Sequence, residues 1–247
     1  IFLLMTLTMT QYPEQLKWAI GVTTAPRKEP TINHCYGSFL CAGFRPHVFK
    51  EPGVSLHPNI FKKDVTERPR RLGAWKNWLY GLMELREANP DADIYGMFQD
   101  DVLLCKNIRP YLETNLPPKD AAVFSVFTPN HFKGDSTWAV VDKGSDLWMA
   151  QTFFFYKNSL DLLLNNNIIK SWNKDRNIDT KVGEWARNIN KPVYYHSPSL
   201  GQHVGHHSTI WKNSHPDGIQ DIPAWGDRSA SDFVGHNFDV MQLLSGV

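Results

Sequence analysis

Residues Asp93 to Leu104 read DIYGMFQDDVLL, an apolar run that is interrupted by two adjacent carboxylates and then resumes. Its apolar part, Ile94 to Phe98, has the length and composition of a buried β-strand. In open α/β sheets, ligands bind in the crevice at the carboxyl ends of the strands. We therefore expect Asp100 and Asp101 to enter such a crevice from the end of a central strand.

The two acids indicate a cation. Neighbouring carboxylates repel each other unless a positive charge lies beside them. Carboxylate oxygens are hard ligands that suit Mg2+ or Mn2+. The pair thus predicts a divalent-metal site that holds a diphosphate. The alternative is that Asp100 and Asp101 open a turn or cap a helix, which is a common role for aspartate.

Size and composition set outer limits. The chain has 247 residues, enough for one large α/β domain with a substantial core. Apolar residues make up 42% and charged residues 21%, which is an ordinary globular composition. The formal net charge of +1 argues against a general polyanion-binding protein, although it is compatible with a local basic patch.

Cysteine usage bears on the compartment. Cys35, Cys41 and Cys105 show no CxxC spacing, so the sequence implies neither a disulfide framework nor a zinc knuckle. This favours a reducing environment, and we expect a cytoplasmic protein of a bacterium or of a virus-infected cell. The apolar residues 1–5 are far fewer than the roughly 20 that span a membrane, so no membrane span is expected. Residues 1–16 are treated as an N-terminal extension.

The other apolar runs follow an α/β order. Residues 18–24 predict a first strand, residues 38–44 a second, and residues 48–58 a third strand or a loop. Further strands are predicted at 121–127, 148–156 and 193–195. Residues 128–147, between the first two of these strands, are predicted as a loop or hairpin over the site, and residues 159–169 as a helix.

One helix is predicted from a single apolar stripe at three- and four-residue steps, running from about Arg68 to Asn89, directly before the acidic strand. The stripe consists of Leu72, Trp75, Leu79, Leu82 and Leu85. Helix, short turn and strand in this order are typical of α/β folds. Arg68, Arg70 and Arg71 stand at the predicted helix start, where positive charge opposes the helix dipole. A phosphate or acidic partner would compensate them; the alternative is a solvated charged face.

Asp179 opens another predicted helix, whose apolar side carries Val182 and Trp185. An aspartate at this position can cap the helix. The same carboxylate can also be held rigidly and aimed into a cleft as a general base. Both roles are open, and Glu184 is the second candidate for the base.

A histidine-rich run completes the pattern. Residues 198–208 read PSLGQHVGHHS. Together with the QDD of residues 99–101, this run resembles the signature of the N-acetylglucosaminyltransferase IV group, inverting glycosyltransferases that use a nucleotide sugar and a metal. Residues 20–27, IGVTTAPR, stand where that family has its first strand. The resemblance spans about residues 18–210, and only the histidine run is specific by itself.

The resemblance implies a GT-A-like fold, a Rossmann-like mixed sheet flanked by helices, over residues 17–210. Residues 211–247 are then a C-terminal extension packed on the same domain. It also implies Mn2+ or Mg2+, a nucleotide-sugar donor that carries uridine diphosphate, and a hydroxyl acceptor. Animal members of the family carry a membrane anchor, whereas none is expected here, so the acceptor is left open between a glycan and a small molecule.

Roles for single residues follow from the same resemblance. Asp101 and His203 are expected to bind the metal ion, which neutralises the leaving diphosphate as a Lewis acid. Asp179, or Glu184 as second choice, is expected to take the proton of the acceptor hydroxyl. The expected donor contacts are Thr23, Thr24, Arg27, Arg71, Asn77, Gln99, Asp100, His207 and Ser208. Gln99 is an amide at the first position of the acidic triplet, which removes one possible charge from the site.

Two other functions are compatible with the sequence. One is a phage-type glycosyltransferase that acts on a hydroxymethylated base in DNA, with Lys62, Lys63 and the three arginines on phosphates and a Trp-rich segment against a flipped base. The other is a non-catalytic sugar- or nucleotide-binding module. A metallohydrolase fits less well, because no HxH or HExxH spacing accompanies the acids.

Overall fold

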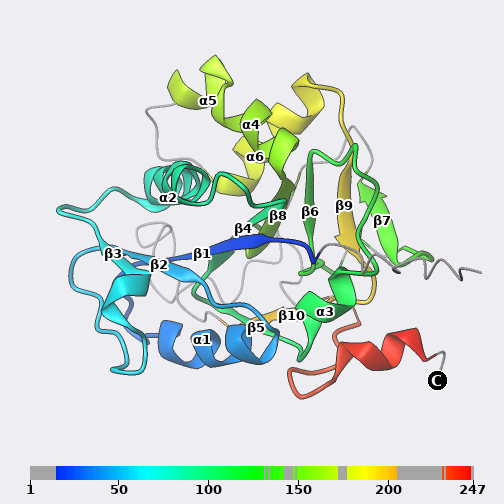
Figure 1. Cartoon of the computed structure of the whole chain (residues 1–247), viewed down its shortest axis with the longest axis horizontal. Helices are drawn as coiled ribbons and strands as arrows, with labels where there is room; N and C mark the ends of the chain where they lie inside the picture. The colour runs from blue at the N-terminus through cyan, green and yellow to red at the C-terminus, as the bar shows by residue number, and fades with distance from the viewer. Residues whose placement is uncertain are drawn as a thin grey trace, which may run out of the picture.

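An eight-stranded mixed sheet forms the centre of the fold, in the order β3-β2-β1-β4-β8-β6-β9-β7 (Figure 1). The structure is a computed structural model, and it describes residues 15–130, 132, 134–141, 147, 149–171, 177–204, 230 and 232–245. The strands of the large sheet are β1 (Trp18–Thr24), β2 (His47–Lys50), β3 (Val65–Glu67), β4 (Ile94–Gln99), β6 (Val123–Ser125), β7 (Trp138–Val141), β8 (Thr152–Tyr156) and β9 (Val193–His196).

A small antiparallel sheet and two helical layers complete the fold. The small sheet pairs β5 (Val102–Leu104) with β10 (Gly201–His203). The helices are α1 (Ile32–Cys41), α2 (Ala74–Ala88), α3 (Ile108–Leu112), α4 (Lys157–Leu164), α5 (Asn167–Ser171) and α6 (Ile178–Asn188), with short 3-10 turns η1 (Lys62–Asp64) and η4 (Val240–Leu244).

Strand direction decides where the ends of the strands meet. β3, β2, β1 and β4 run parallel to one another, and β8 returns antiparallel between β4 and β6. β1 and β4 pair from Trp18 opposite Ile94 to Thr23 opposite Gln99. Because parallel strands end at the same edge, the segments that follow β1, β2 and β4 are brought together there.

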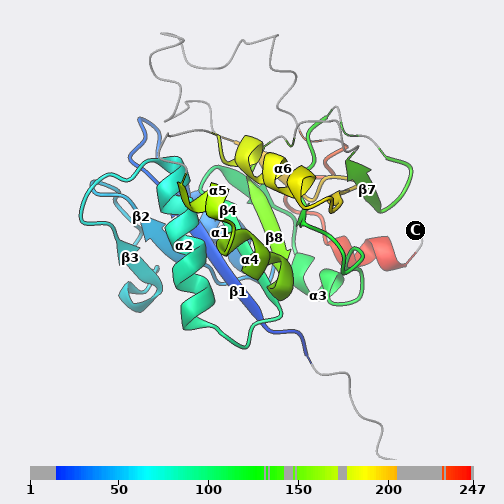
Figure 2. The same cartoon turned by 90° about the horizontal axis from the view of Figure 1, so that it is seen from above.

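Each face of the sheet carries its own apolar core. In Figures 1 and 2, α2, α4, α5 and α6 lie over one face; α1, α3 and the small sheet lie under the other. On the first face, Trp78 of α2 packs edge-on against Phe155 of β8. On the second face, Phe39 of α1 packs against Phe98 of β4. Burial of each such large side chain stabilises the fold by about 1.5–3 kcal/mol, so both layers are held firmly.

Gly81 contributes to the close packing of α2 on the sheet. A Cβ added to Gly81 would lie 2.9 Å from both Met97 Cε and Phe49 Cδ2. These distances are shorter than van der Waals contact, so a larger residue would force Phe49, Met97 or the helix itself to shift. The absence of a side chain at this position therefore lets α2 lie directly on the strands that lead to the acidic pair.

The predicted α/β class, a mixed sheet flanked by helices, is confirmed. The strands predicted at residues 18–24 and 94–98 are β1 and β4. The strand predicted at 38–44 is wrong, because those residues belong to α1 and to the turn that follows it. Ile32, Cys35 and Phe39 are buried at helical spacing, and this longer stripe outweighs the short apolar run. The helix predicted at 159–169 is two helices, α4 and α5.

The basic cluster also differs from its predicted setting. α2 begins at Ala74, so Arg68, Arg70 and Arg71 precede the helix. Arg68 is buried, and its guanidinium pairs with Glu84 and donates to Asn77 Oδ1 at 2.8 Å. This arginine is committed to fixing α2 and is not available to a phosphate of DNA.

The described part of the C-terminal region returns to the domain. Lys106 N donates to Phe238 O at 2.9 Å, and Asn107 Nδ2 donates to Asp239 Oδ2 at 2.9 Å. The domain limits at residues 16/17 and 210/211 stay predictions, since residues 1–14 and 205–229 lie outside the described residues. Within the described residues, no helix combines the length and the apolar character that a membrane crossing requires.

Candidate functional site

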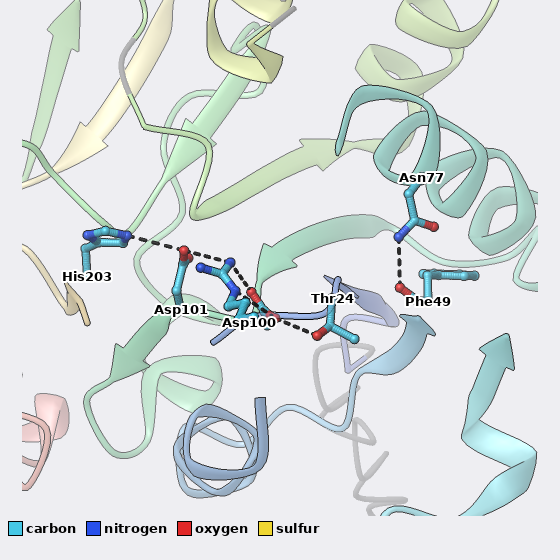
Figure 3. A network of polar contacts seen from close by, with 7 residues as sticks. Thr24, Phe49, Asn77, Asp100, Asp101 and His203 are labelled. Carbon is cyan, nitrogen blue, oxygen red and sulfur yellow. Dashed lines mark hydrogen bonds and ion pairs between the residues drawn. The ribbon is translucent and has the colours of Figure 1, made fainter. Parts of the chain in front are cut away.

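The candidate site lies where β1 and β4 end. Asp100 and Asp101 directly follow β4 and form the turn into β5, while Thr24 is the last residue of β1 beside them. Thr24 Oγ1 donates to Asp100 Oδ2 at 2.5 Å (Figure 3). Both carboxylates are buried, with exposed fractions of 2% and 5%. Two charges at such depth need strong compensation, because transfer out of water disfavours the ionised form.

Arg27 supplies the positive charge. It lies in the loop after β1, and its Nη2 contacts Asp100 Oδ1 and lies 2.9 Å from Asp101 Oδ2. Its Nε donates to Asp100 Oδ2 at 3.3 Å. The guanidinium therefore bridges the two carboxylates from one side, and its side chain is only 10% exposed.

His203 reaches the same carboxylate through the small sheet. β10 pairs antiparallel with β5, which sets His203 opposite Val102, and Val204 N donates to the main-chain oxygen of Asp101 at 2.8 Å. As a result, His203 Nε2 lies 3.3 Å from Asp101 Oδ2 (Figure 3). Residues about a hundred positions apart in the chain thus meet at one oxygen atom.

The two carboxylates differ electrostatically. Burial raises the pKa of Asp100 to about 6, against the opposing effect of Arg27. Burial acts on Asp101 in the same direction, but His203 and Arg27 together hold the pKa of Asp101 below its usual range. Burial disfavours a charged Arg27, yet Asp101 and Asp100 outweigh it, so the pKa of Arg27 is raised and the guanidinium stays charged. Asp101 is consequently the more firmly ionised of the pair.

Two observations test whether a divalent ion fits these residues. Asp101 Oδ1 is buried and makes no hydrogen bond within the described residues. The 3.3 Å between Asp101 Oδ2 and His203 Nε2 is close to the ~3 Å that separates adjacent ligands on an octahedral ion with ~2.1 Å bonds. The described residues hold no group of three or more His, Cys, Asp or Glu around one point. Mg2+ sites commonly use one or two carboxylates and fill the rest with water and phosphate, so the donor set fits.

Asp179 lies one loop away from the carboxylates. It is in the first turn of α6, where its Oδ2 accepts from Met149 N and its Oδ1 accepts from Thr180 N, both at 2.8 Å. Met149 has φ 65, a left-handed conformation that is unusual for a side chain of this kind. Two residues further on, Gln151 O accepts from Gln99 N at 2.9 Å. The loop 149–151 therefore connects Asp179 to the end of β4, and its role as base stays a prediction.

The other predicted site residues divide into two groups. Thr23 is half-buried and pairs with Gln99 across β1 and β4, next to the carboxylates. Asn77 lies apart on α2, where its Nδ2 donates to Phe49 O at 3.0 Å (Figure 3). Arg71 is exposed, at the start of the loop before α2. Glu184 is half-buried on α6. Their roles as donor contacts or as base stay predictions.

His207 and Ser208 lie outside the described residues, so the structure places neither.

One buried acid at the same edge was not predicted as a site residue. Glu51 follows β2, is 2% exposed, and its N donates to Thr24 O at 3.0 Å. Its Oε1 accepts from Leu72 N and Gly73 N, at 2.9 and 2.7 Å, while Arg71 Nε is 3.6 Å from Oε2. Glu51 thus fixes the loop before α2 against the end of β2. Its position directly after a strand was the available signal, which the neighbouring Pro52 and Gly53 obscured.

Comparisons with known proteins bear on the fold. The chain matches no known family profile and no curated protein sequence. Among solved structures it is similar to GalNAc-T7 crystallised with UDP, GalNAc and Mn2+, with a TM-score of 0.52 and 8% identity. That match covers 78% of this chain and 44% of the transferase, so the chain spans less than half of its length. A197 from STIV is also similar, with a TM-score of 0.45, 10% identity, and coverage of 77% and 86%.

The fold is therefore GT-A-like, as in glycosyltransferases of the GalNAc-T kind. At 8% identity this likeness concerns the arrangement of the chain and not its individual residues.

Proposed function

We propose that this protein is a metal-dependent inverting glycosyltransferase that moves a sugar from a uridine-diphosphate donor to a hydroxyl acceptor. The observation that carries the proposal is the buried pairing of Asp101 with His203 at the carboxyl edge of a GT-A-like sheet, with one oxygen of Asp101 making no hydrogen bond to any described residue. UDP, GalNAc and Mn2+ in the similar GalNAc-T7 structure support this choice of donor and ion. The resemblance to the N-acetylglucosaminyltransferase IV group belongs to the same proposal.

Asp101 and His203 would hold the ion. A bound divalent ion neutralises the charge that develops on the leaving diphosphate. Asp100 is fixed by Thr24 and Arg27 at the end of β4, so its carboxylate offers hydrogen-bond acceptors to the ribose of the donor. Arg27 brings a permanent positive charge to the same place, where it attracts the diphosphate.

Inversion needs a base on the face of the sugar opposite the leaving group. We assign this role to Asp179, with Glu184 as the second choice. Hydrogen bonds from Met149 N and Thr180 N hold the Asp179 carboxylate in one orientation. A positioned base that takes the proton of the attacking hydroxyl accelerates transfer by roughly 10²–10⁴-fold. The acceptor would then lie over the loop 149–151.

Thermal unfolding with nucleotides and MnCl2 tests the proposal. A ligand that binds only the folded protein at about 100 times its Kd stabilises it by about 2.7 kcal/mol. We expect UDP and UDP-sugars to raise the melting temperature strongly with Mn2+ and weakly without it. Asp101→Asn and His203→Ala should each remove the metal-dependent part of the shift.

Asp91→Asn is the matched control. It neutralises an exposed carboxylate that precedes the N-terminal end of β4, away from the site, and should leave the shift in melting temperature intact. The proposal is contradicted if no nucleoside diphosphate or UDP-sugar stabilises the wild-type protein in the presence of Mn2+. It is equally contradicted if Asp101→Asn responds as the wild type does.

A further inference from the structure

Arg27 occupies an unusual position for a residue beside a cation site. Its Nη2 lies 2.9 Å from Asp101 Oδ2, the same oxygen that lies 3.3 Å from His203 Nε2. A single carboxylate oxygen is therefore in contact with both the guanidinium and the imidazole. The guanidinium also pairs with Asp100, and its side chain is 10% exposed, so two ion pairs hold it against the carboxylates.

This arrangement brings two positive charges into competition. An ion bound to Asp101 Oδ2 at ~2.1 Å would lie within about 5 Å of Arg27 Nη2, since the two bonds share one oxygen. Like charges at this separation destabilise each other, and burial strengthens the effect. Binding of the ion alone must therefore weaken the contact between Arg27 and Asp101.

A diphosphate changes the balance. The planar guanidinium of arginine matches the oxygens of a phosphate and forms two parallel hydrogen bonds with it. When nucleotide and ion arrive together, Arg27 can exchange Asp101 for a phosphate and stay paired throughout. Its loop position after β1 leaves the side chain free of the strand ladder, so the exchange needs no change in the sheet.

We propose that Arg27 is an internal counter-cation that couples metal binding to nucleotide binding. It neutralises the acidic pair in the ligand-free protein, competes with a divalent ion for Asp101, and turns to the diphosphate when both ligands are present. This role rests on the proposed function, and it means that Arg27 makes the metal ion and the nucleotide bind together. Because coupling is reciprocal, UDP strengthens Mn2+ binding by the same factor as Mn2+ strengthens UDP binding.

Titration of MnCl2 into the protein, followed by the electron paramagnetic resonance signal of free Mn2+, measures the competition without any turnover. The wild type and Arg27→Gln are titrated with and without UDP. We expect Arg27→Gln to bind Mn2+ alone more tightly than the wild type by roughly 5- to 150-fold, the usual range of coupling between sites. UDP should strengthen Mn2+ binding in the wild type and much less in the variant.

Three further variants make the result specific. Lys28→Gln removes the same charge from the exposed neighbour of Arg27 and should leave Mn2+ binding unchanged. Asp101→Asn should abolish Mn2+ binding both in the otherwise wild-type protein and in Arg27→Gln. Melting curves show whether Arg27→Gln is folded; if it is not, the double variant Arg27→Gln with Asp100→Asn keeps the charges balanced and takes its place.

The failures of the two proposals are distinct. If Arg27→Gln binds Mn2+ alone no more tightly than the wild type, while UDP still strengthens the wild type, the coupling role is wrong and the transferase proposal stands. An equal effect of Lys28→Gln also refutes the role, because it would reflect only the general field of the loop. If the wild type binds no Mn2+ even with UDP, the proposed function fails and the role of Arg27 fails with it.

Discussion

The buried histidine at the end of β9 makes stability depend on pH. His196 is fully buried; its Nδ1 lies 2.7 Å from Pro198 O, and its Nε2 lies 2.9 Å from the hydroxyl of Tyr111. A carbonyl oxygen can only accept, so Nδ1 carries the hydrogen and Nε2 accepts from Tyr111 in the neutral ring. Burial lowers the pKa of His196 to about 4, although the contact with Pro198 opposes this.

The size and sign of the effect follow from the pKa difference. Below pH 6.5 the unfolded chain binds a proton at this histidine, whereas the folded protein does not until about pH 4. Unfolding is therefore favoured as the pH falls through this window. At 1.36 kcal/mol per pH unit, the free energy of unfolding loses about 3 kcal/mol between pH 6.5 and pH 4. Above pH 6.5 the contribution of His196 is fully present and constant.

Urea unfolding of the wild type and of His196→Gln at intervals from pH 7.5 to pH 4 isolates this contribution. The free energy of unfolding of the wild type minus that of the variant should fall by about 3 kcal/mol as the pH is lowered across the window. The raised pKa of Asp100 has the opposite effect on stability to that of His196 as the pH falls. This effect is the same in the wild type and in the variant, so it cancels when their free energies of unfolding are subtracted. Exposed His34→Gln is the control and should follow the wild type. Parallel pH profiles of the wild type and His196→Gln would refute the argument.

Three further predictions concern the site and the core. Asp179→Asn should leave UDP binding intact and lower sugar transfer by roughly 10²–10⁴-fold, measured as UDP release; retained turnover would move the base role to Glu184. Thr24→Val removes the buried hydroxyl donor of the first carboxylate and should cost about 1.5–3 kcal/mol in urea unfolding. Gly96→Ala would place a Cβ 2.7 Å from an isoleucine methyl and should cost about 1–3 kcal/mol, whereas Gly37→Ala, in open space on a helix, should be neutral or stabilising.

Local patterns predicted α2 from a long periodic stripe and β4 from an unbroken apolar run. The stripe from Trp75 to Leu85 spans three turns, and α2 follows it closely. The run from Ile94 to Phe98 is continuously apolar because β4 is buried on both faces. The segment 38–44 was predicted as a strand because its residues have the composition of a strand. Most of them form the end of α1. A short apolar run does not distinguish these cases.

Partners within the site depend on contacts that local patterns do not encode. The meeting of Asp101 with His203 was expected from the family resemblance, and the structure brings the two side chains to 3.3 Å; that they bind a metal stays a prediction. The pairing of β10 with β5 brings them together, and this pairing was not predictable because the two strands are about a hundred residues apart in the chain. The bridging position of Arg27 likewise depends on how a loop after β1 folds over the end of β4.

Asp100 and Asp101 form the turn from β4 into β5, and they also contact residues far away in the chain. An aspartate that only opens a turn lies at the surface and hydrogen-bonds to the backbone of its own turn. Asp100 and Asp101 are instead buried, and their partners are the distant Thr24, Arg27 and His203. Burying two carboxylates side by side is costly, and the contacts with Thr24, Arg27 and His203 offset this cost. Within the described residues, Asp101 also keeps a buried carboxylate oxygen without a hydrogen-bond partner. That Asp101 and His203 bind a divalent cation stays a prediction, which the Mn2+ titration tests.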